Sequence, residues 1–296
     1  MDKETFADYL KNMLTHINGY AVKIKVVTKT KNNGVQSTGL LMENSNGCSP
    51  ILFIDRYYED YMNGRALEDI VNSVTSSAEL ADEVKNDIDL TLIESWEKAK
   101  NYLDVRILSL DKNYDMLQNY VYMEHLDFAV IPILSFVSDD SIHTVKISNE
   151  LVKMWNVSTT DVFSNAIYNS RAKKQYIARY IKDSISEYCK HSSVEIPKMI
   201  VLSNIHLMNG AASILDTFFM EEVYEEYGGP FYVLPSSIHE CIAIPAYDNV
   251  NPDNLRELVK SINDDVVSKE EILSYSVYFF DGEELSIAAK GEWDNV

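Results

Sequence analysis

Tyr232-Val-Leu-Pro-Ser-Ser-Ile-His-Glu-Cys-Ile-Ala-Ile-Pro245 consists of two apolar runs on either side of a polar centre. Short apolar runs that are bounded by proline and serine are typical of strands. We therefore predict two strands, over 231–234 and 241–244, joined through the polar centre. Burying hydroxyl, imidazole and carboxylate groups costs free energy unless they are paired. The polar residues therefore have either a structural partner or a function: Ser236, Ser237, His239 and Glu240.

Strand patterns of the same kind recur along the chain, several of them paired across short turns. They cover residues 20–27, 36–42, 49–54, 105–108, 121–125, 128–137, 141–147, 199–202, 274–281 and 285–289. Apolar residues at a spacing of three and four predict helices over 6–17, 67–74, 90–102, 111–118, 149–155, 158–167, 175–189, 211–227 and 254–262. Because these elements follow no regular β–α–β order, we predict an α+β fold with mixed, mainly antiparallel sheets and packed helices.

The length of 296 residues suits one large domain or two ordinary ones. The polar stretch 78–89 is the best candidate for a boundary, although no linker rich in proline or glycine supports it. We therefore predict an N-terminal α+β subdomain over 1–82 and a C-terminal α+β domain over 83–296. The alternative is that both parts pack as one body.

The composition is that of a folded and strongly acidic protein. Hydrophobic residues make up 46% and aromatic residues 11% of the chain, which is enough for a sizeable core. A total of 46 acidic and 26 basic residues gives a net charge of −20. This charge repels nucleic acid and suits a basic protein partner or mimicry of nucleic-acid charge, and solubility alone also accounts for it. We expect a protein partner, basic if charge guides it, and neither nucleic acid nor a membrane.

The sequence predicts neither a membrane span nor a cofactor. The longest apolar run is short and is interrupted by Pro132 and Ser135. The first residues are polar and acidic, unlike a signal peptide, so we expect a cytoplasmic protein. Cys48, Cys189 and Cys241 are widely spaced and odd in number, which speaks against a disulfide framework and against a cysteine zinc site. We therefore predict no metal site and no cofactor.

The polar centre between the first two strands has two interpretations. His239-Glu240 begins like a zinc-protease motif, but that motif needs a second histidine where Ala243 stands. Ser236 and Ser237 lack the flanking glycines of a nucleophile elbow, and hydroxyls next to proline commonly satisfy a turn. His239 is therefore either bonded to the backbone as a structural residue or completed by distant residues as a ligand or base.

A second candidate site is the loop that contains Asn204, His206, Asn209 and Gly210. It follows a predicted strand and precedes a predicted helix, so its backbone amides can face an anion. The loop has one glycine and lacks the lysine and glycine patterns of phosphate-binding loops. Capping of the following helix by Asn209 is the alternative.

Three other patterns are incomplete motifs or have an ordinary structural explanation. Ser170-Arg-Ala-Lys173 matches Ser-x-x-Lys, but its companion motifs are absent. Ser268 and Glu271 have the spacing of a capping box at the start of a helix. A group of basic residues is expected on one solvated helix face: Arg171, Lys173, Lys174, Arg179 and Lys182.

Several segments together resemble an uncharacterised bacterial family, a domain-of-unknown-function group typical of anaerobic Firmicutes. They are Trp155-Asn-Val with Phe163-Ser-Asn-Ala166, Ser203-Asn204 with Asn209-Gly210-Ala211, Tyr232-Val-Leu-Pro-Ser-Ser-Ile-His-Glu240 and Leu273-Ser-Tyr-Ser-Val-Tyr278. The most specific piece is Pro-Ser-Ser-Ile-His-Glu at 235–240. The resemblance implies a bacterial, cytoplasmic protein, and no activity, substrate or cofactor.

Because no catalytic or cofactor motif is complete, the leading hypothesis is a non-catalytic binding or interaction protein with an acidic, tyrosine-rich surface. One alternative is a hydrolase, with or without the assistance of a metal ion, that uses the cluster of Ser236, Ser237, His239 and Glu240. The other alternative is an acidic mimic of nucleic acid that occupies a basic partner.

Overall fold

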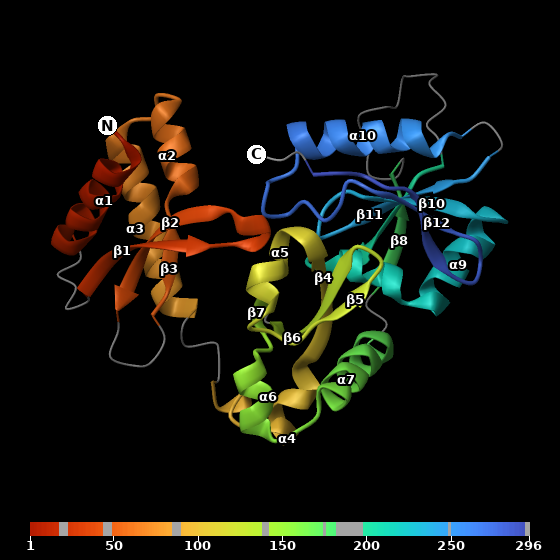
Figure 1. The fold of residues 1–296 in the computed structure, drawn as a ribbon. Coiled ribbons are helices and arrows are strands. Elements are labelled where there is room, and N and C mark those ends of the chain that lie inside the picture. The colour runs from red at the N-terminus through yellow and green to blue at the C-terminus, as the bar shows by residue number, and fades with distance from the viewer. Residues whose placement is uncertain are drawn as a thin grey trace. The chain divides into compact units, whose positions relative to one another are not determined.

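The computed structural model describes residues 1–17, 23–43, 49–84, 90–137, 142–173, 176–181, 198–247 and 250–293. The chain divides into two compact units (Figure 1). Unit 1 contains Met1–Thr91, and unit 2 contains Leu92–Val137 and Ile142–Val296. In both units helices accompany sheets whose neighbouring strands are antiparallel, which confirms the α+β prediction. The boundary predicted between 82 and 83 stays a prediction.

Unit 1 combines helices with an antiparallel sheet in the order β1-β2-β3. Its elements are α1 (Lys3–Ile17), β1 (Lys23–Thr30), η1 (Asn32–Gly34), β2 (Gln36–Glu43), β3 (Ile51–Phe53), α2 (Asp55–Met62) and α3 (Leu67–Val84). The predicted hairpin turn is confirmed: Asn33 and Gly34 adopt φ values of 57° and 73°, a conformation that asparagine and glycine tolerate. Apolar residues of α1, β2 and α3 form the core, among them the fully buried Phe6, Leu40 and Ile70.

Unit 2 contains the remaining elements. They are η2 (Leu90–Leu92, of which only Leu92 belongs to this unit), α4 (Trp96–Ala99), η3 (Lys100–Tyr102), β4 (Leu103–Ser109), α5 (Leu110–Leu117), β5 (Met123–His125), β6 (Phe128–Val137), β7 (Ile142–Lys146), α6 (Asn149–Trp155), α7 (Thr159–Ala172), β8 (Tyr176–Tyr180), β9 (Ile200–Asn204), η4 (Gly210–Leu215), α9 (Thr217–Tyr227), β10 (Phe231–Pro235), β11 (Cys241–Pro245), α10 (Pro252–Asp265), β12 (Val277–Phe280) and β13 (Leu285–Ala289).

The hairpin of β10 and β11 lies in the middle of a six-stranded sheet with the order β13-β12-β10-β11-β9-β8. Its alternating side chains point to opposite faces. Phe231 and Val233 enter the large core of unit 2, whereas Tyr232 and Leu234 belong to a small cluster with Val259 of α10. The two apolar runs flanking the polar centre thus form a strand pair that is covered on both faces, which explains why they lack a polar side.

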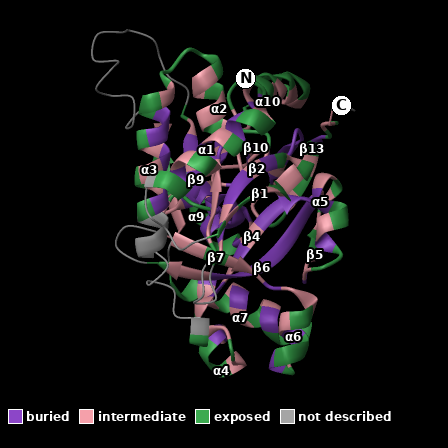
Figure 2. Cartoon of the chain, turned by 90° about the vertical axis from the view of Figure 1, so that its left-hand side faces the viewer, coloured by how far each residue is buried: buried purple, intermediate pink, exposed green. Residues whose placement is uncertain are grey.

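A four-stranded sheet supplies the other part of this core. Its order is β4-β6-β5, and β7 pairs with the far end of β6. Helix α7 packs against β4, and the buried strands β4 and β6 stand out in Figure 2. Asp127, at the turn between β5 and β6, accepts hydrogen bonds from Ser274, Ser276 and Tyr278 of the segment that contains β12. This carboxylate therefore ties the two sheets of unit 2 together.

Several predicted helices differ from the structure. The helix predicted over 175–189 begins as β8, which pairs with β9 from Tyr176↔Asn204 to Tyr180↔Ile200; residues 182–197 lie outside the described part. Aromatic and β-branched residues, such as those of this segment, favour a strand over a helix. The helix predicted over 90–102 is split into η2, α4 and η3. The helix predicted over 211–227 is interrupted at Asp216, which has extended backbone and caps α9.

Two further expectations concern single residues. Ser268 and Glu271 form no capping box; residues 269–271 are a turn without a following helix. Cys241 is a buried free cysteine, and Cys48 and Cys189 lie outside the described residues. No helix in the described ranges is both long and apolar enough to span a bilayer.

Candidate functional site

The predicted polar cluster forms the turn between β10 and β11. The Ser237 hydroxyl accepts a hydrogen bond from the backbone N–H of His239 at 3.0 Å. The Ser237 N–H in turn donates to the carbonyl oxygen of Glu240 at 3.1 Å. Ser236 and Glu240 are half-buried beside them. These contacts are those of a serine-stabilised turn.

His239 is held through both ring nitrogens. Its Nδ1 accepts the backbone N–H of Asn209 at 3.1 Å, and its Nε2 lies 3.5 Å from Oε1 of Glu271. Because Nδ1 accepts a hydrogen bond, the ring proton is on Nε2 and faces the carboxylate. The imidazole therefore has no free nitrogen with which to take a proton from a substrate.

The second predicted site, the loop between β9 and η4, packs against this turn. The Asn204 side chain closes the loop: its Oδ1 accepts from the N–H groups of His206 and Met208, and its Nδ2 donates to the Met208 carbonyl. Ser203 donates through its hydroxyl to the carbonyl of His239 at 2.8 Å. The structure thus brings the two predicted sites together, but each uses its polar groups to hold the other in place.

Close packing at this contact explains Gly210. A Cβ atom there would lie 2.6 Å from the backbone N of Asn204 and 2.7 Å from the carbonyl oxygen of His239. Asn209, immediately before it, has a positive φ of 57° and makes no side-chain cap hydrogen bond. The proposed capping role of Asn209 is therefore wrong, because its backbone N–H binds the imidazole instead. The loop amides of His206, Met208 and Asn209 are occupied by protein groups, which leaves them unavailable to an anion.

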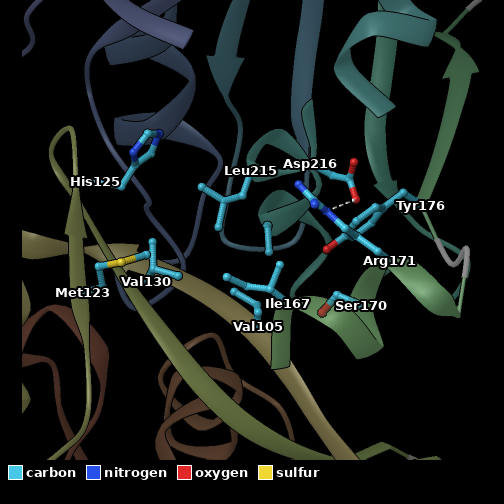
Figure 3. Close-up of a pocket in the computed structure, with 11 residues that line it drawn as sticks. Val105, Met123, His125, Val130, Ile167, Ser170, Arg171, Tyr176, Leu215 and Asp216 are labelled. Carbon is cyan, nitrogen blue, oxygen red and sulfur yellow. Dashed lines mark ion pairs between the residues drawn. The ribbon is translucent and has the colours of Figure 1, made fainter. Parts of the chain in front are cut away.

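A cavity of about 180 Å³ lies elsewhere in unit 2, between the four-stranded sheet, α7 and η4. It is lined by Val105, Met123, His125, Val130, Ile167, Ser170, Arg171, Tyr176, Ala212, Leu215 and Asp216. In Figure 3, Met123, Val130 and His125 lie on one side, Val105, Ile167 and Leu215 in the middle, and Arg171, Asp216 and Tyr176 on the other side. The wall is thus mostly apolar and has a polar end.

The polar end is built from two paired groups. Arg171, at the end of α7, places Nε 3.3 Å from Oδ2 of the buried Asp216, whose Oδ1 accepts the N–H of Phe219. Ser170 donates through its hydroxyl to Oδ1 of Asp104 at 2.6 Å. The helix break at Asp216 matters here, because it directs this carboxylate toward Arg171 while capping α9.

Tyr176 of β8 lies among these charges. Burial raises the pKa of its phenol strongly, and the nearby Asp104 carboxylate raises it further. The hydroxyl therefore stays protonated and able to donate at neutral pH. At the apolar side, burial lowers the pKa of His125, so its imidazole is neutral at neutral pH. The cavity consequently offers uncharged aromatic donors beside the guanidinium of Arg171 and the carboxylate of Asp216, which also line it.

A model of a protein family matches residues 3–282, and its description is Family of unknown function (DUF5688). The chain belongs to this family. No curated protein and no solved structure matches the sequence. The resemblance to a family of unknown function is therefore confirmed, whereas its bacterial origin and the importance of 235–240 as its hallmark stay predictions. The matched range contains both the turn and the cavity.

Part of the predicted loop borders a second, smaller hollow next to the cavity. This hollow of about 20 Å³ has room for roughly one water molecule and shares Val105, Ser170 and Tyr176 with the cavity. Asn204, His206 and Asn209 also line it. The turn residues at 236–240 line neither of these two spaces.

Sequence reasoning missed the residues that form the polar end. The sequence patterns place Ser170 in an incomplete Ser-x-x-Lys match and Arg171 on a solvated helix face, and they predict a helix at Tyr176. Asp216 stood inside a predicted helix, although an aspartate directly before an apolar run is a recognisable helix cap. In the described parts of the chain, no group of three or more His, Cys, Asp or Glu side chains is arranged to hold a metal ion.

Proposed function

We propose that this protein is a non-catalytic binding protein and that unit 2 takes up a small molecule in its cavity. The observation that carries this proposal is the mostly apolar wall of the cavity with polar groups gathered at one end. Sites for small molecules commonly combine an apolar lining with a few polar groups that fix the orientation of the ligand. A dry cavity of roughly 150 Å³ can hold benzene, so about 180 Å³ suffices for a small apolar group.

The geometry of the turn favours binding over hydrolysis. A serine hydrolase needs a hydroxyl hydrogen-bonded to a base, whereas the described contacts of His239 join its ring to Asn209 and Glu271. In the cavity, the single proton of the Ser170 hydroxyl lies between two acceptors, Oδ1 of Asp104 at 2.6 Å and the carbonyl oxygen of Ala166 at 3.0 Å. These contacts hold the hydroxyl on the wall of the cavity, as expected for a group that positions a ligand.

The proposal can be tested with a panel of small apolar carboxylates, amines, alcohols and amino acids. Thermal shift assays would identify ligands, and calorimetry would give their stoichiometry. We expect at least one compound to bind at a ratio of one to one. Replacing Ala212 with leucine puts a larger side chain in the cavity and should abolish this binding. The same replacement at Ala178, which is exposed on β8, is the matched control and should leave binding unchanged.

Two results would contradict the proposal. One is that no compound binds, or that the bound compound is unaffected by Ala212→Leu in a variant that still folds. The other is chemical conversion of the ligand, which mass spectrometry of the recovered compound would detect after prolonged incubation. Recovery of the intact ligand supports the non-catalytic assignment.

A further inference from the structure

The charges at the polar end of the cavity limit what can bind there. Arg171 and Asp216 line the cavity and pair with each other, whereas Asp104 lines the smaller neighbouring hollow, which shares Ser170 and Tyr176 with the cavity. A ligand that contributes only a carboxylate would add a third negative charge to those of Asp104 and Asp216. A ligand that contributes only an ammonium group would leave the guanidinium with Asp216 as its sole ionic partner. A ligand that carries both groups can pair with the guanidinium and with the Asp104 carboxylate at the same time.

Arg171 has room for a carboxylate. Its ion pair with Asp216 runs through Nε, and its ζ carbon lies 5.5 Å from the centroid of the Phe218 ring. Among the described residues, neither of its Nη atoms donates a hydrogen bond. The side chain is 42% exposed, so a ligand can approach it. A guanidinium fork of this kind binds carboxylates with two parallel hydrogen bonds.

Asp104 and Tyr176 can receive an ammonium group. Asp104 uses Oδ1 for two hydrogen bonds, from its neighbour's backbone N–H and from Ser170. Its Oδ2 accepts no hydrogen bond from the described part of the chain. An ammonium group has three donors and no acceptor. It therefore matches a carboxylate oxygen that lacks a donor, with the phenol oxygen of Tyr176 as a second acceptor.

The geometry points to an α-amino acid with an apolar side chain as the ligand of this cavity, an inference that rests on the proposed binding function. Its carboxylate meets Arg171, and its ammonium group enters the neighbouring water-sized hollow that Asp104 lines. Its side chain enters the apolar part beside Val105, Val130 and Leu215. The cavity volume of about 180 Å³ suits a side chain the size of leucine or phenylalanine.

Calorimetry with L-leucine, L-phenylalanine and three relatives of leucine tests this assignment. Leucinamide lacks the carboxylate, isocaproate lacks the ammonium group, and isoamylamine keeps only the amine and the apolar body. We expect leucine or phenylalanine to bind with one-to-one stoichiometry. Each relative should bind at least about tenfold more weakly than leucine, the size of effect expected for a lost charge-assisted hydrogen bond. Equal or tighter binding of any relative would overturn the assignment.

Variants then locate the two charged ends. Arg171→Gln and Asp104→Asn should each weaken leucine binding by at least about tenfold. Asparagine keeps the Oδ1 acceptor for Ser170, so the fold around it is preserved. Arg179→Gln changes an exposed arginine of β8 and is the matched control, which should bind leucine like the unchanged protein. Unchanged leucine affinity in the Arg171 or Asp104 variant would contradict the assignment.

The failure of this inference is distinguishable from the failure of the binding function. If neither amino acid binds but another compound of the panel does, and Ala212→Leu abolishes that binding, the cavity is a binding site for a different ligand class. If no compound binds in the cavity, both proposals fail.

Discussion

The turn between β10 and β11 and the polar end of the cavity contain similar kinds of side chain but use them differently. In the turn, Ser237 and the His239 imidazole bind backbone groups of their own turn and of the neighbouring loop. In the cavity, Ser170 and Arg171 pair with carboxylates, and the guanidinium keeps donors unused in the described structure. Polar groups whose hydrogen bonds are all made with backbone groups stabilise the fold. Side chains that keep unused hydrogen-bond donors or acceptors beside a cavity can bind a ligand.

The largest expected effect concerns the turn. Replacing Gly210 with alanine puts Cβ within 2.6 Å of the Asn204 backbone N and 2.7 Å of the His239 carbonyl oxygen. Because backbone cannot move aside as a flexible side chain can, we expect a loss of unfolding free energy on the order of 3 kcal/mol. Urea denaturation would measure this loss.

Gly229 gives the matched control for this substitution. A Cβ atom there meets nothing within 4 Å, so Gly229→Ala should change the stability little. If Gly210→Ala is as stable as Gly229→Ala, the loop at Gly210 does not pack tightly against the turn at His239. The contrast between a structural turn and a ligand-binding cavity would then be weaker.

A second test removes the imidazole that joins loop and turn. His239→Ala leaves the N–H of the buried Asn209 without its acceptor, which should cost about 2 kcal/mol of unfolding free energy. His16→Ala is the control, because His16 is exposed on α1 of unit 1. Ligand affinity of the cavity should be the same in both variants. Loss of ligand binding in His239→Ala with a folded protein would mean that the turn takes part in function.

At the cavity we expect a small effect on stability and a large effect on ligand affinity. Arg171 is 42% exposed and Asp216 keeps its hydrogen bond from Phe219, so Arg171→Gln should lower the stability by only about 1 kcal/mol. The same change should remove most of the affinity for the ligand. Denaturation and calorimetry on one protein sample would measure both quantities. A large loss of stability with unchanged affinity would show that the ion pair is structural.

Most strands were predictable because their signals are local. The apolar run 231–234, the turn residues at Asn32-Asn33-Gly34 and the hairpin over Gly282 each fix their own conformation. The strand β8 could not be recognised, because its pairing with β9 depends on a distant segment. Its residues fit a helical spacing equally well, and tertiary contacts override such a weak local preference.

The candidate sites could be predicted only in part, because a sequence shows local patterns and does not show contacts between distant segments. The crowding of polar groups at 236–240 predicts either structural partners or a function, and in the structure the His239 imidazole contacts Asn209 and Glu271. No local pattern indicates that residues 104, 170, 176 and 216 meet, since they come from four separate elements. A composition signal exists wherever polar residues are adjacent in sequence, but a cavity arises from packing between elements and leaves no comparable pattern.

The smallest effect expected is a pH dependence at the apolar side of the cavity. Burial lowers the pKa of His125 from its ordinary value of 6.5. Between the lowered pKa and 6.5, the unfolded chain binds more protons at this residue than the folded protein does. The stability that this neutral histidine contributes is therefore fully present above pH 6.5 and is lost as the pH falls through the folded pKa.

His125→Asn removes this dependence without adding a charge. As the pH is lowered from neutral values, the unfolding free energy of the unchanged protein should fall more steeply than that of His125→Asn, and denaturation at a series of pH values would measure the difference. If the two proteins, unchanged and His125→Asn, show the same pH profile, water reaches His125 freely. The apolar side of the cavity is then wetter than an apolar ligand would require, and that result would weaken the assignment of an apolar side chain to this space.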